Sequence, residues 1–272
     1  MNELPAWEDP RRVLGRHNLR AKKGMSQNFL TSRHAVEKIA EALAIHEGER
    51  VIELGPGLGT LTAALLRHGA QVLAIDADKD MLGVLALEFA DYPALEARFG
   101  DATQLDLEAL GFDRIAVCGN LPYAVTGGIF RRLVEQYTRV SRAVLMVQKE
   151  VRDRLVAEPG TKQYGALTVF TRAVFDVRSV VVVPAGAFHP APRVDSAVVA
   201  LTPRASAIEL TDAFTSVVRA SFEARRKTLR NALLRIRPPE VVDAALASVS
   251  IDGKRRGETL SGEEFASLAS AL

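Results

Sequence analysis

The sequence has only one cysteine, Cys118, among its 272 residues, so an internal disulfide is impossible. Cys118 lies in an apolar segment, which indicates packing and fits a reducing compartment. No run of about 18 apolar residues occurs, so we expect no membrane-spanning helix. The amino terminus lacks the basic start and apolar stretch of a secretory signal. These absences predict a cytoplasmic protein.

Cysteines and histidines at the spacing of zinc ligands are also missing, so we expect no metal site. The net charge is only +2, but the basic residues are unevenly distributed. Two stretches collect them: Arg11, Arg12, Arg16, Arg20, Lys22 and Lys23, and then Arg219, Arg225, Arg226, Lys227, Arg230, Arg235 and Arg237. Such stretches are usually solvated faces, and they become candidate polyanion sites only beside a suitable active site.

Short apolar segments alternate with amphipathic ones through much of the chain. After an irregular basic arm over residues 1–30, the pattern predicts strands at 51–54, 72–75, 115–118 and 143–147, and helices at 36–43, 61–67, 81–89, 128–135 and 149–156. This alternation is typical of an α/β fold whose parallel sheet is covered on both faces.

The pattern changes beyond residue 155. Segments 177–183 and 197–201 are rich in β-forming residues and flank a proline-containing loop, and past residue 203 only helical patterns remain. We therefore predict a domain over residues 1–204, comprising the basic arm and a Rossmann-like catalytic fold, and a small all-helical C-terminal domain over residues 205–272.

A glycine-rich turn, Gly55-Pro56-Gly57-Leu58-Gly59, follows the first predicted strand and precedes a helix. Glycines let the backbone approach a ligand, and the helix start offers unpaired N–H groups. Dinucleotide sites favour G-x-G-x-x-G, whereas here Thr60 holds the last position. The spacing disfavours a nicotinamide oxidoreductase and suits a nucleoside that carries an amino-acid tail.

Two acids lie in register with this turn. Asp76 ends the next strand, 21 residues after Gly55, where its carboxylate can accept hydrogen bonds from ribose hydroxyls. Asp101 follows the expected third strand and can recognise an adenine amino group. Either acid alone would more often be a surface or capping residue. Together with Gly55, Gly57 and Gly59, they indicate a Rossmann-like methyltransferase that uses S-adenosylmethionine.

The strand at 115–118 leads into Gly119 and then Asn120-Leu121-Pro122-Tyr123. Adenine N6 is a poor nucleophile because its lone pair is delocalised into the ring. The Asn120 side-chain oxygen and the Leu121 carbonyl can accept its two N–H bonds, since Pro122 stiffens the loop. Tyr123 offers a face on which a base stacks. The motif indicates methylation of an amino group, although a simple turn is the alternative.

Phe188 lies in the proline-containing loop, Phe188-His189-Pro190-Ala191-Pro192-Arg193-Val194-Asp195-Ser196. We expect its ring to form a second wall of the base pocket, with a packing anchor as the alternative. His189 is interpreted as a surface residue, because this chemistry does not require it.

Together these motifs resemble the small-subunit ribosomal RNA adenine N6,N6-dimethyltransferase family. The resemblance extends from about Lys22 to Leu234. It rests on Gln27-Asn28-Phe29-Leu30, the glycine loop with Glu53, Asn120-Leu121-Pro122-Tyr123, Val194-Asp195-Ser196, and Phe222-Glu223-Ala224-Arg225-Arg226-Lys227-Thr228-Leu229-Arg230. Departures are small: Ser26 stands where the family usually has glycine, and Asp76 where glutamate is more common.

The resemblance implies that Asn28 and Leu30 contact S-adenosylmethionine, alongside Gly55, Asp76, Asp101 and Asn120. It implies that a monomer without metal dimethylates two adjacent adenosines near the 3′ end of small-subunit rRNA, within an assembling particle. For the C-terminal basic stretch we expect one continuous helix whose RNA-facing residues are Arg219, Arg226, Lys227 and Arg230.

Two alternatives stay open. The related large-subunit rRNA adenine methyltransferases that confer macrolide resistance share most of these motifs, although Asn-Leu-Pro-Tyr and Arg-Arg-Lys-Thr-Leu-Arg favour the small-subunit family. A noncatalytic rRNA-binding assembly factor would not need the intact glycine loop, Asp76 and Asn120.

Overall fold

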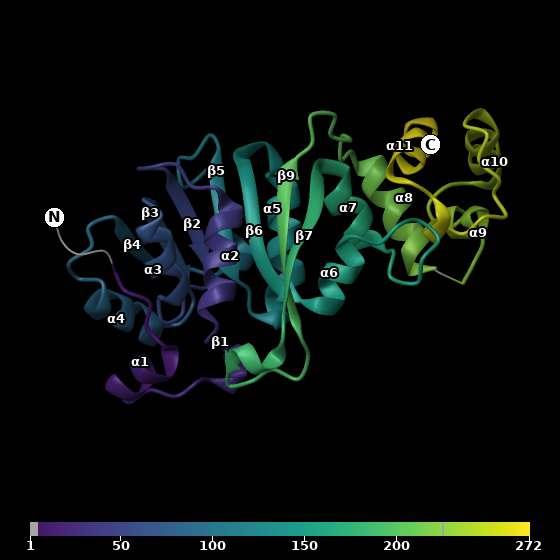
Figure 1. Cartoon of the computed structure of the whole chain (residues 1–272). Coiled ribbons are helices and arrows are strands. Elements are labelled where there is room, and N and C mark those ends of the chain that lie inside the picture. Colours follow the sequence, from purple (N-terminus) through teal and green to yellow (C-terminus); the bar gives the residue numbers. More distant parts are fainter. Residues whose placement is uncertain (1–4, 225) are drawn as a thin grey trace. The chain divides into compact units, whose positions relative to one another are not determined.

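The computed structural model describes residues 5–224 and 226–272. The chain forms two compact units, one comprising Met1–Arg152 with Arg178–Pro203 and the other comprising Asp153–Val177 with Arg204–Leu272. The first unit is a sheet flanked by helices, and the second is mainly helical (Figure 1). We describe each unit by itself.

A seven-stranded sheet with the order β4-β3-β2-β5-β6-β9-β7 forms the centre of the first unit (Figure 1). Strands β4 to β6 pair in parallel, and β9 runs antiparallel to β6. The strands are β2 (Arg50–Leu54), β3 (Gln71–Asp76), β4 (Leu95–Phe99), β5 (Ile115–Asn120), β6 (Val140–Gln148), β7 (Phe175–Val183) and β9 (Ser196–Pro203). The parallel core confirms the predicted α/β class.

The predicted helices form at their expected places between these strands: α2 (Arg33–Leu43), α3 (Thr60–Arg67), α4 (Lys79–Glu88), α5 (Thr126–Glu135) and α6 (Lys149–Leu155). In α2 the buried positions Val36, Ile39, Ala40 and Leu43 follow helical spacing. They pack into the main hydrophobic cluster of the sheet. Burial of both sheet faces explains why β2 and β5 are nearly continuous apolar runs.

The amino-terminal segment is more ordered than the irregular arm that we expected. It contains α1 (Pro10–Arg16), which Asp9 caps by accepting a hydrogen bond from the Arg11 N–H. Val13 and Leu14 of α1 are buried in a cluster with Phe29, Leu58, Met81 and Val84. The expectation was wrong because the apolar pair in a basic stretch is too short to give a helical period.

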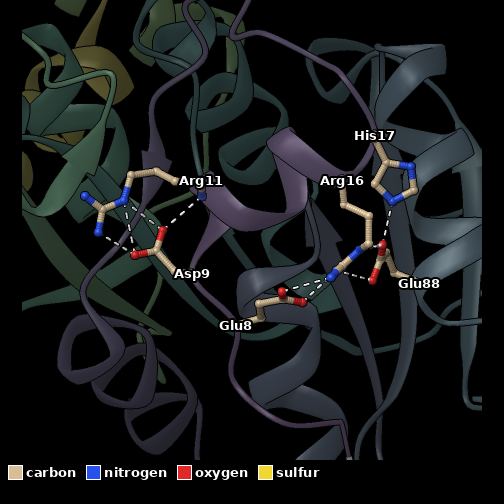
Figure 2. Close-up of polar contacts among 6 residues, drawn as sticks. All are labelled: Glu8, Asp9, Arg11, Arg16, His17 and Glu88. Carbon is tan, nitrogen blue, oxygen red and sulfur yellow. Dashed lines mark hydrogen bonds and ion pairs between the residues drawn. The ribbon is translucent and has the colours of Figure 1, made fainter.

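Acidic partners surround several of the basic residues in this segment (Figure 2). Arg16 Nη2 lies 2.7 Å from carboxylate oxygens of both Glu8 and Glu88, and Arg11 pairs with Asp9. His17 Nε2 also contacts Glu88, at 2.5 Å. The partners come from residues just before the stretch and from α4, so the local sequence between Arg11 and Lys23 did not reveal them.

A separate two-stranded sheet joins distant parts of the first unit. Strand β1 (Phe29–Leu30) pairs antiparallel with β8 (Phe188–His189), so that Leu30 lies opposite Phe188. The pairing connects the segment after α1 to the loop before β9. Short 3₁₀ helices complete the chain: η1 (Lys23–Met25), η2 (Ala102–Gln104), η3 (Tyr123–Val125), η4 (Tyr137–Arg139), η5 (Ala185–Ala187) and η6 (Gly257–Thr259).

The second unit packs its helices around buried aromatic side chains. Its helices after α6 are α7 (Ala166–Val174), α8 (Asp212–Glu223), α9 (Leu229–Leu233), α10 (Pro239–Ser248) and α11 (Gly262–Ala271). Phe222 lies between the rings of Tyr164 and Phe265, with centroids 6.0 Å from each. The Tyr164 hydroxyl donates to the Leu260 carbonyl at 2.8 Å.

These contacts explain how the unit boundaries differ from the expected division. One boundary, between Pro203 and Arg204, lies next to the predicted one. Residues 153–177, however, belong to the helical unit, because α7 packs against α8 and α11. Helix α7 was not predicted from the sequence, because its apolar pattern merges with the β-rich segment that follows.

Two further features concern the described residues as a whole. No helix there has the length and apolar character needed to cross a membrane. Within the same residues, no group of three or more histidine, cysteine, aspartate or glutamate side chains is arranged to hold a metal ion.

Candidate functional site

The glycine loop lies between β2 and α3, as expected. Gly55, Gly57 and Gly59 have φ values of 67°, 54° and 81°, in the left-handed region that favours glycine. At Gly59 an added Cβ would lie 2.3 Å from Cε2 of Phe89, so this glycine is also required for packing. A Cβ added at Gly55 would lie 3.7 Å from the Asn120 carbonyl oxygen, which is an ordinary contact. The loop therefore passes beside the end of β5.

Asp76, at the end of β3, holds the glycine loop directly. Its Oδ2 accepts a hydrogen bond from the Gly57 N–H at 3.1 Å, and its Oδ1 accepts one from the Asp78 N–H at 2.8 Å. Burial raises the pKa of Asp76, although these backbone donors act in the opposite direction. An added Cβ at Gly57 would lie 3.0 Å from Cε1 of Phe29. Asp76 thus holds the loop through its backbone, and the Phe29 ring leaves little room for a side chain at Gly57.

A pocket opens at the carboxyl ends of β2, β3 and β5, where parallel α/β sheets bind ligands. Most of the residues expected to contact the cofactor line it: Asn28, Leu30, Gly55, Gly57, Asp76 and Asn120. Gly59 and Asp101 are not among the lining residues. The structure therefore brings the amino-terminal motif, the glycine loop and the two strand ends to one pocket.

Asp101 is exposed and caps a short helix. Its Oδ1 accepts a hydrogen bond from the Thr103 N–H at 2.8 Å, at the start of η2. The preceding residue, Gly100, donates its N–H to the Asp76 carbonyl at 3.0 Å, so the segment lies beside β3. The geometry matches the capping alternative, and recognition of adenine by Asp101 stays a prediction.

The segment that covers the pocket, residues 22–30, is anchored at Asp78; we call this segment the strap. Lys22 Nζ and Gln27 Nε2 donate to the two carboxylate oxygens of Asp78, each at 2.7 Å. The Asp78 side chain is 3% exposed. Burial alone would raise the pKa of Asp78, but the hydrogen bonds from Lys22, the Asp80 N–H and Gln27 lower it.

The anchor at Asp78 was not predicted from the sequence. Gln27 belongs to the motif at residues 27–30, but its partner Asp78 lies on another element, and no local pattern links the two residues. The other strap contact was equally hidden: the Asn120 side-chain Nδ2 donates to the Asn28 carbonyl at 3.0 Å. Contacts between segments so far apart in sequence become visible only in the folded chain.

Asn120 and the residues after it have distinct environments. Asn120 lines the pocket, and with its Nδ2 bound to Asn28, its Oδ1 accepts no hydrogen bond from a described residue. Leu121 is buried, and its N–H donates to the Met146 carbonyl at 3.1 Å. The Tyr123 hydroxyl and Oγ of Ser196 share one hydrogen bond of 2.7 Å, in which either hydroxyl can be the donor. The strand end thus leaves one side-chain oxygen available for a ligand.

The role of Phe188 as a second wall of the base pocket stays a prediction. The Phe188 side chain is 5% exposed and belongs to the main hydrophobic cluster, together with Leu30 and Val36. Phe188 is not among the residues that line the pocket at the glycine loop. Pairing of β8 with β1 turns the ring into the core, and this position matches the packing alternative. His189 is exposed, as expected.

Glu53 is a buried acid that the sequence reading treated only as part of a motif. It lines the pocket and is 1% exposed. The Thr62 hydroxyl donates to Glu53 Oε2 at 2.6 Å. Burial is the main cause that raises the pKa of Glu53 to about 8, and the nearby charge of Asp76 acts in the same direction.

The C-terminal basic residues do not form the single helical stripe that we expected. Helix α8 ends at Glu223, and Thr228 starts α9 by accepting a hydrogen bond from the Asn231 N–H. Arg225 lies outside the described residues. Because the helix is interrupted, the spacing of seven and four residues between Arg219, Arg226 and Arg230 does not align them.

These residues also differ in their partners. Arg219 is exposed on α8, and Arg226 and Lys227 are exposed in the turn between the helices. Arg230 instead donates to both carboxylate oxygens of Asp243, at 2.5 and 2.7 Å. An open groove at the turn is lined by Phe222, Glu223, Ala224, Arg226, Lys227, Asn231 and Arg235.

The parallel sheet, the glycine loop and Asp76 at the neighbouring strand end define a methyltransferase of the Rossmann-like class. Comparisons with known proteins specify the family. The family model for ribosomal RNA adenine dimethylase matches residues 18–272. The chain is 46% identical to the ribosomal RNA small subunit methyltransferase A of Myxococcus xanthus over 97% of this chain and 95% of that protein. It is 41% identical to the protein of the same name from Geobacillus thermodenitrificans, over 96% and 94%.

Solved structures agree with this assignment. A dimethyladenosine transferase from Plasmodium falciparum has a TM-score of 0.77 and 26% identity, over 88% of this chain and 95% of that chain. The 23S rRNA methyltransferase ErmE has a TM-score of 0.68 and 28% identity, over 90% and 99%. The chain belongs to the ribosomal RNA adenine dimethylase family, whose methyl donor is S-adenosylmethionine.

Proposed function

We propose that this enzyme transfers methyl groups from S-adenosylmethionine to N6 of two adjacent adenosines near the 3′ end of small-subunit rRNA. The main observation that supports this proposal is that Asn120, from the Asn-Leu-Pro-Tyr motif, lines the same pocket as the glycine loop and Asp76. A donor site and an acceptor-holding side chain are thereby combined at one edge of the sheet. The substrate is rRNA within a small-subunit assembly particle in the cytoplasm, and the enzyme acts as a monomer without a metal.

The pocket has the donors and acceptors that S-adenosylmethionine requires. Positive φ values let the backbone of Gly55 and Gly57 come close to a ligand, and Asp76 supplies carboxylate oxygens for ribose hydroxyls. When bound, S-adenosylmethionine supplies a methyl group on a positively charged sulfur. The strap residues Asn28 and Leu30 close the pocket from the other side.

Asn120 prepares the acceptor nitrogen. Because the Asn120 Nδ2 donates to the Asn28 carbonyl, the Asn120 Oδ1 is free to accept a hydrogen bond from the N6–H of adenine. Together with the Leu121 carbonyl, it draws N6 toward a tetrahedral shape and frees the lone pair. The lone pair forms a bond to the methyl carbon, the carbon–sulfur electrons stay on sulfur, and N6 releases a proton to solvent. Placement in line with the sulfur supplies most of the acceleration.

Tyr123 and the C-terminal basic residues serve the RNA. The hydrogen bond to Ser196 orients the Tyr123 ring, on which the target adenine stacks after leaving its neighbours. Arg219, Arg226, Lys227 and Arg230 contact backbone phosphates, which offset the cost of moving the base. Exposure of Arg226 and Lys227 in the open groove supports this role most directly.

The relatives favour small-subunit RNA over the alternatives. The two compared relatives named as small-subunit methyltransferases are 46% and 41% identical, whereas the 23S rRNA enzyme ErmE is 28% identical. A noncatalytic assembly factor would have no need for Asn120 facing a complete donor pocket. Mass spectrometry of nucleosides from small- and large-subunit rRNA, with and without the gene, tests this choice. Loss of dimethyladenosine only from large-subunit rRNA would contradict the proposal.

The Asn120→Ala variant tests the mechanism. We expect single-turnover methyl transfer to fall by roughly 100- to 1000-fold, because Asn120 acts mainly as N6 changes geometry. Affinity for S-adenosylmethionine should stay within several-fold of wild type by calorimetry. Tyr123→Phe is the matched control in the same motif: it loses the hydrogen bond to Ser196 but keeps the ring that stacks on the base, so its activity should fall far less than that of Asn120→Ala. Transfer by Asn120→Ala within tenfold of wild type would reduce Asn120 to a turn residue.

A further inference from the structure

The donor pocket contains two acidic groups, and its described lining residues include no basic side chain. Glu53 and Asp76 both line it, and among the described residues in its lining there is no lysine, arginine or histidine. Lys22, on the strap, pairs instead with Asp78 and Asp80, at 2.7 and 2.6 Å. A positive charge that enters this pocket therefore meets two carboxyl groups whose charge no described lining residue balances.

The two acids are held differently. Asp76 accepts backbone N–H groups on both oxygens, from Gly57 and Asp78, and these donors favour its ionised form. Glu53 is 1% exposed, and its side-chain hydrogen bond comes from the neutral Thr62 hydroxyl. With burial raising the pKa of Glu53 to about 8, its carboxyl group is mostly protonated at neutral pH in the empty pocket.

Among the described residues, the elements packed around Glu53 contribute no positively charged side chain to the pocket lining. Strand β3 contributes Asp76, and β5 contributes Cys118, a buried thiol whose pKa is also raised by burial. Helix α2 contributes apolar side chains such as Val36, and α3 contributes Thr62. The strap contributes amide and apolar side chains to the lining. Ionisation of Glu53 therefore has to be compensated by the ligand itself.

We propose that Glu53 is the counter-charge for the methyl donor: it is protonated in the empty pocket and releases its proton to solvent as the sulfonium ligand enters. The inference rests on the proposed function for the identity of that ligand. After transfer, the product S-adenosylhomocysteine is a neutral thioether at sulfur, so the attraction that kept Glu53 ionised is weaker. Glu53 then takes up a proton from solvent more readily while the product is bound, which favours exchange of product for new donor.

Calorimetry on the full chain measures this proton directly. S-adenosylmethionine and S-adenosylhomocysteine are titrated separately at pH 7, in phosphate and in Tris, whose ionisation enthalpies differ. We expect release of up to about one proton per S-adenosylmethionine bound and a smaller release for S-adenosylhomocysteine. Donor affinity should rise between pH 6 and pH 8, by at most about tenfold per pH unit, and then level off.

Variants assign the proton to a residue. Glu53→Gln keeps the shape of the side chain but cannot ionise, so proton release should nearly vanish and donor affinity should lose its pH dependence. Glu96→Gln, which changes an exposed acid on β4, is the matched control and should behave as wild type. Thr62→Val keeps the acid but removes a hydrogen bond that lowers its pKa, so the rise in affinity should move to higher pH.

The outcomes separate this inference from the proposed function. Binding of S-adenosylmethionine without proton release, or equal release by Glu53→Gln and wild type, would overturn the role of Glu53 and leave the proposed function intact. Equal release by the variant would place the source at another group, such as Asp76 or the α-ammonium group of the ligand. If Glu53→Gln does not fold, an unchanged pH profile in Thr62→Val overturns the inference in its place. No binding of S-adenosylmethionine at all would overturn both.

Discussion

The amino-terminal and C-terminal basic stretches carry similar charges but differ in what these charges contact. In the first, Arg11, Arg16 and Lys22 each lie against one or two carboxylates of the same unit. In the second, within residues 5–224 and 226–272, no acid pairs with Arg226 or Lys227. Paired cations stabilise the fold locally, whereas exposed unpaired cations keep their charge available for phosphates. On the proposed function, Arg226 and Lys227 are therefore the charges available to RNA, whereas Arg11, Arg16 and Lys22 are engaged within the fold.

Among the variants that test this comparison of the two basic stretches, the largest effect is expected at the C-terminal turn. Replacing Arg226 and Lys227 together by glutamine should weaken binding of the methylated ribosomal substrate by about 10- to 100-fold, because phosphate contacts are lost. The log–log slope of affinity against salt should become shallower by roughly 0.7–0.9 units per lost contact. Filter binding across a salt series measures both. Thermal stability and donor affinity are the controls and should barely move, and an unchanged slope would make this turn an ordinary solvated surface.

A moderate effect is expected at Asp78, where the amino-terminal cation has a structural task. Asp78→Asn weakens the hydrogen bonds from Lys22 and Gln27 that anchor the strap, and should lower the free energy of unfolding by about 1–2 kcal/mol. Donor affinity should also fall, since the strap lines the pocket. Urea denaturation and calorimetry measure the two effects.

Asp80→Asn is the matched control for Asp78. Asp80 also contacts Lys22, but it is half exposed and has no bond to Gln27, so its replacement should change stability less. The pKa of Asp78 is lowered in the fold. Its contribution is therefore present above about pH 4 and is lost as the pH falls further. Equal effects of the two variants would show that Gln27 adds nothing to the anchor.

The smallest effect is expected at Arg16. Arg16→Gln removes the ion pairs with Glu8 and Glu88, but the side chain is 47% exposed, so solvent screening limits the loss of stability to less than about 1 kcal/mol. Affinity for the ribosomal substrate should not change. Arg12→Gln is the control for stability, because it removes an exposed charge of the same stretch without breaking the ion pairs with Glu8 and Glu88. A fall in substrate affinity with Arg16→Gln would erase the distinction between the two stretches.

Local patterns were sufficient for most of the sheet and for the glycine loop. Buried parallel strands leave nearly continuous apolar runs, and the glycines between β2 and α3 follow from the φ values that the turn requires. Asp76 and Asn120 could be placed because the carboxyl ends of parallel strands meet at one edge.

Features that depend on distant contacts could not be predicted in the same way. The anchor at Asp78 joins segments that share no pattern, and the ring of Phe188 turns into the core because β8 pairs with β1. The basic helix was expected to continue because its charge spacing suited a stripe. Thr228 instead caps a new helix. The spacing of charged residues does not show whether a threonine lies inside a helix or caps the start of one.

The pairing of β1 with β8 bears on how the enzyme is made. The strap leaves a translating ribosome well before its partner, Phe188–His189, which emerges only after six strands of the main sheet. A nascent chain that stops before β8 has the glycine loop and Asn120 but lacks the strand that holds Leu30 in place. The β1–β8 pairing that orders Leu30 at the pocket can therefore form only when nearly all of the first unit has been translated.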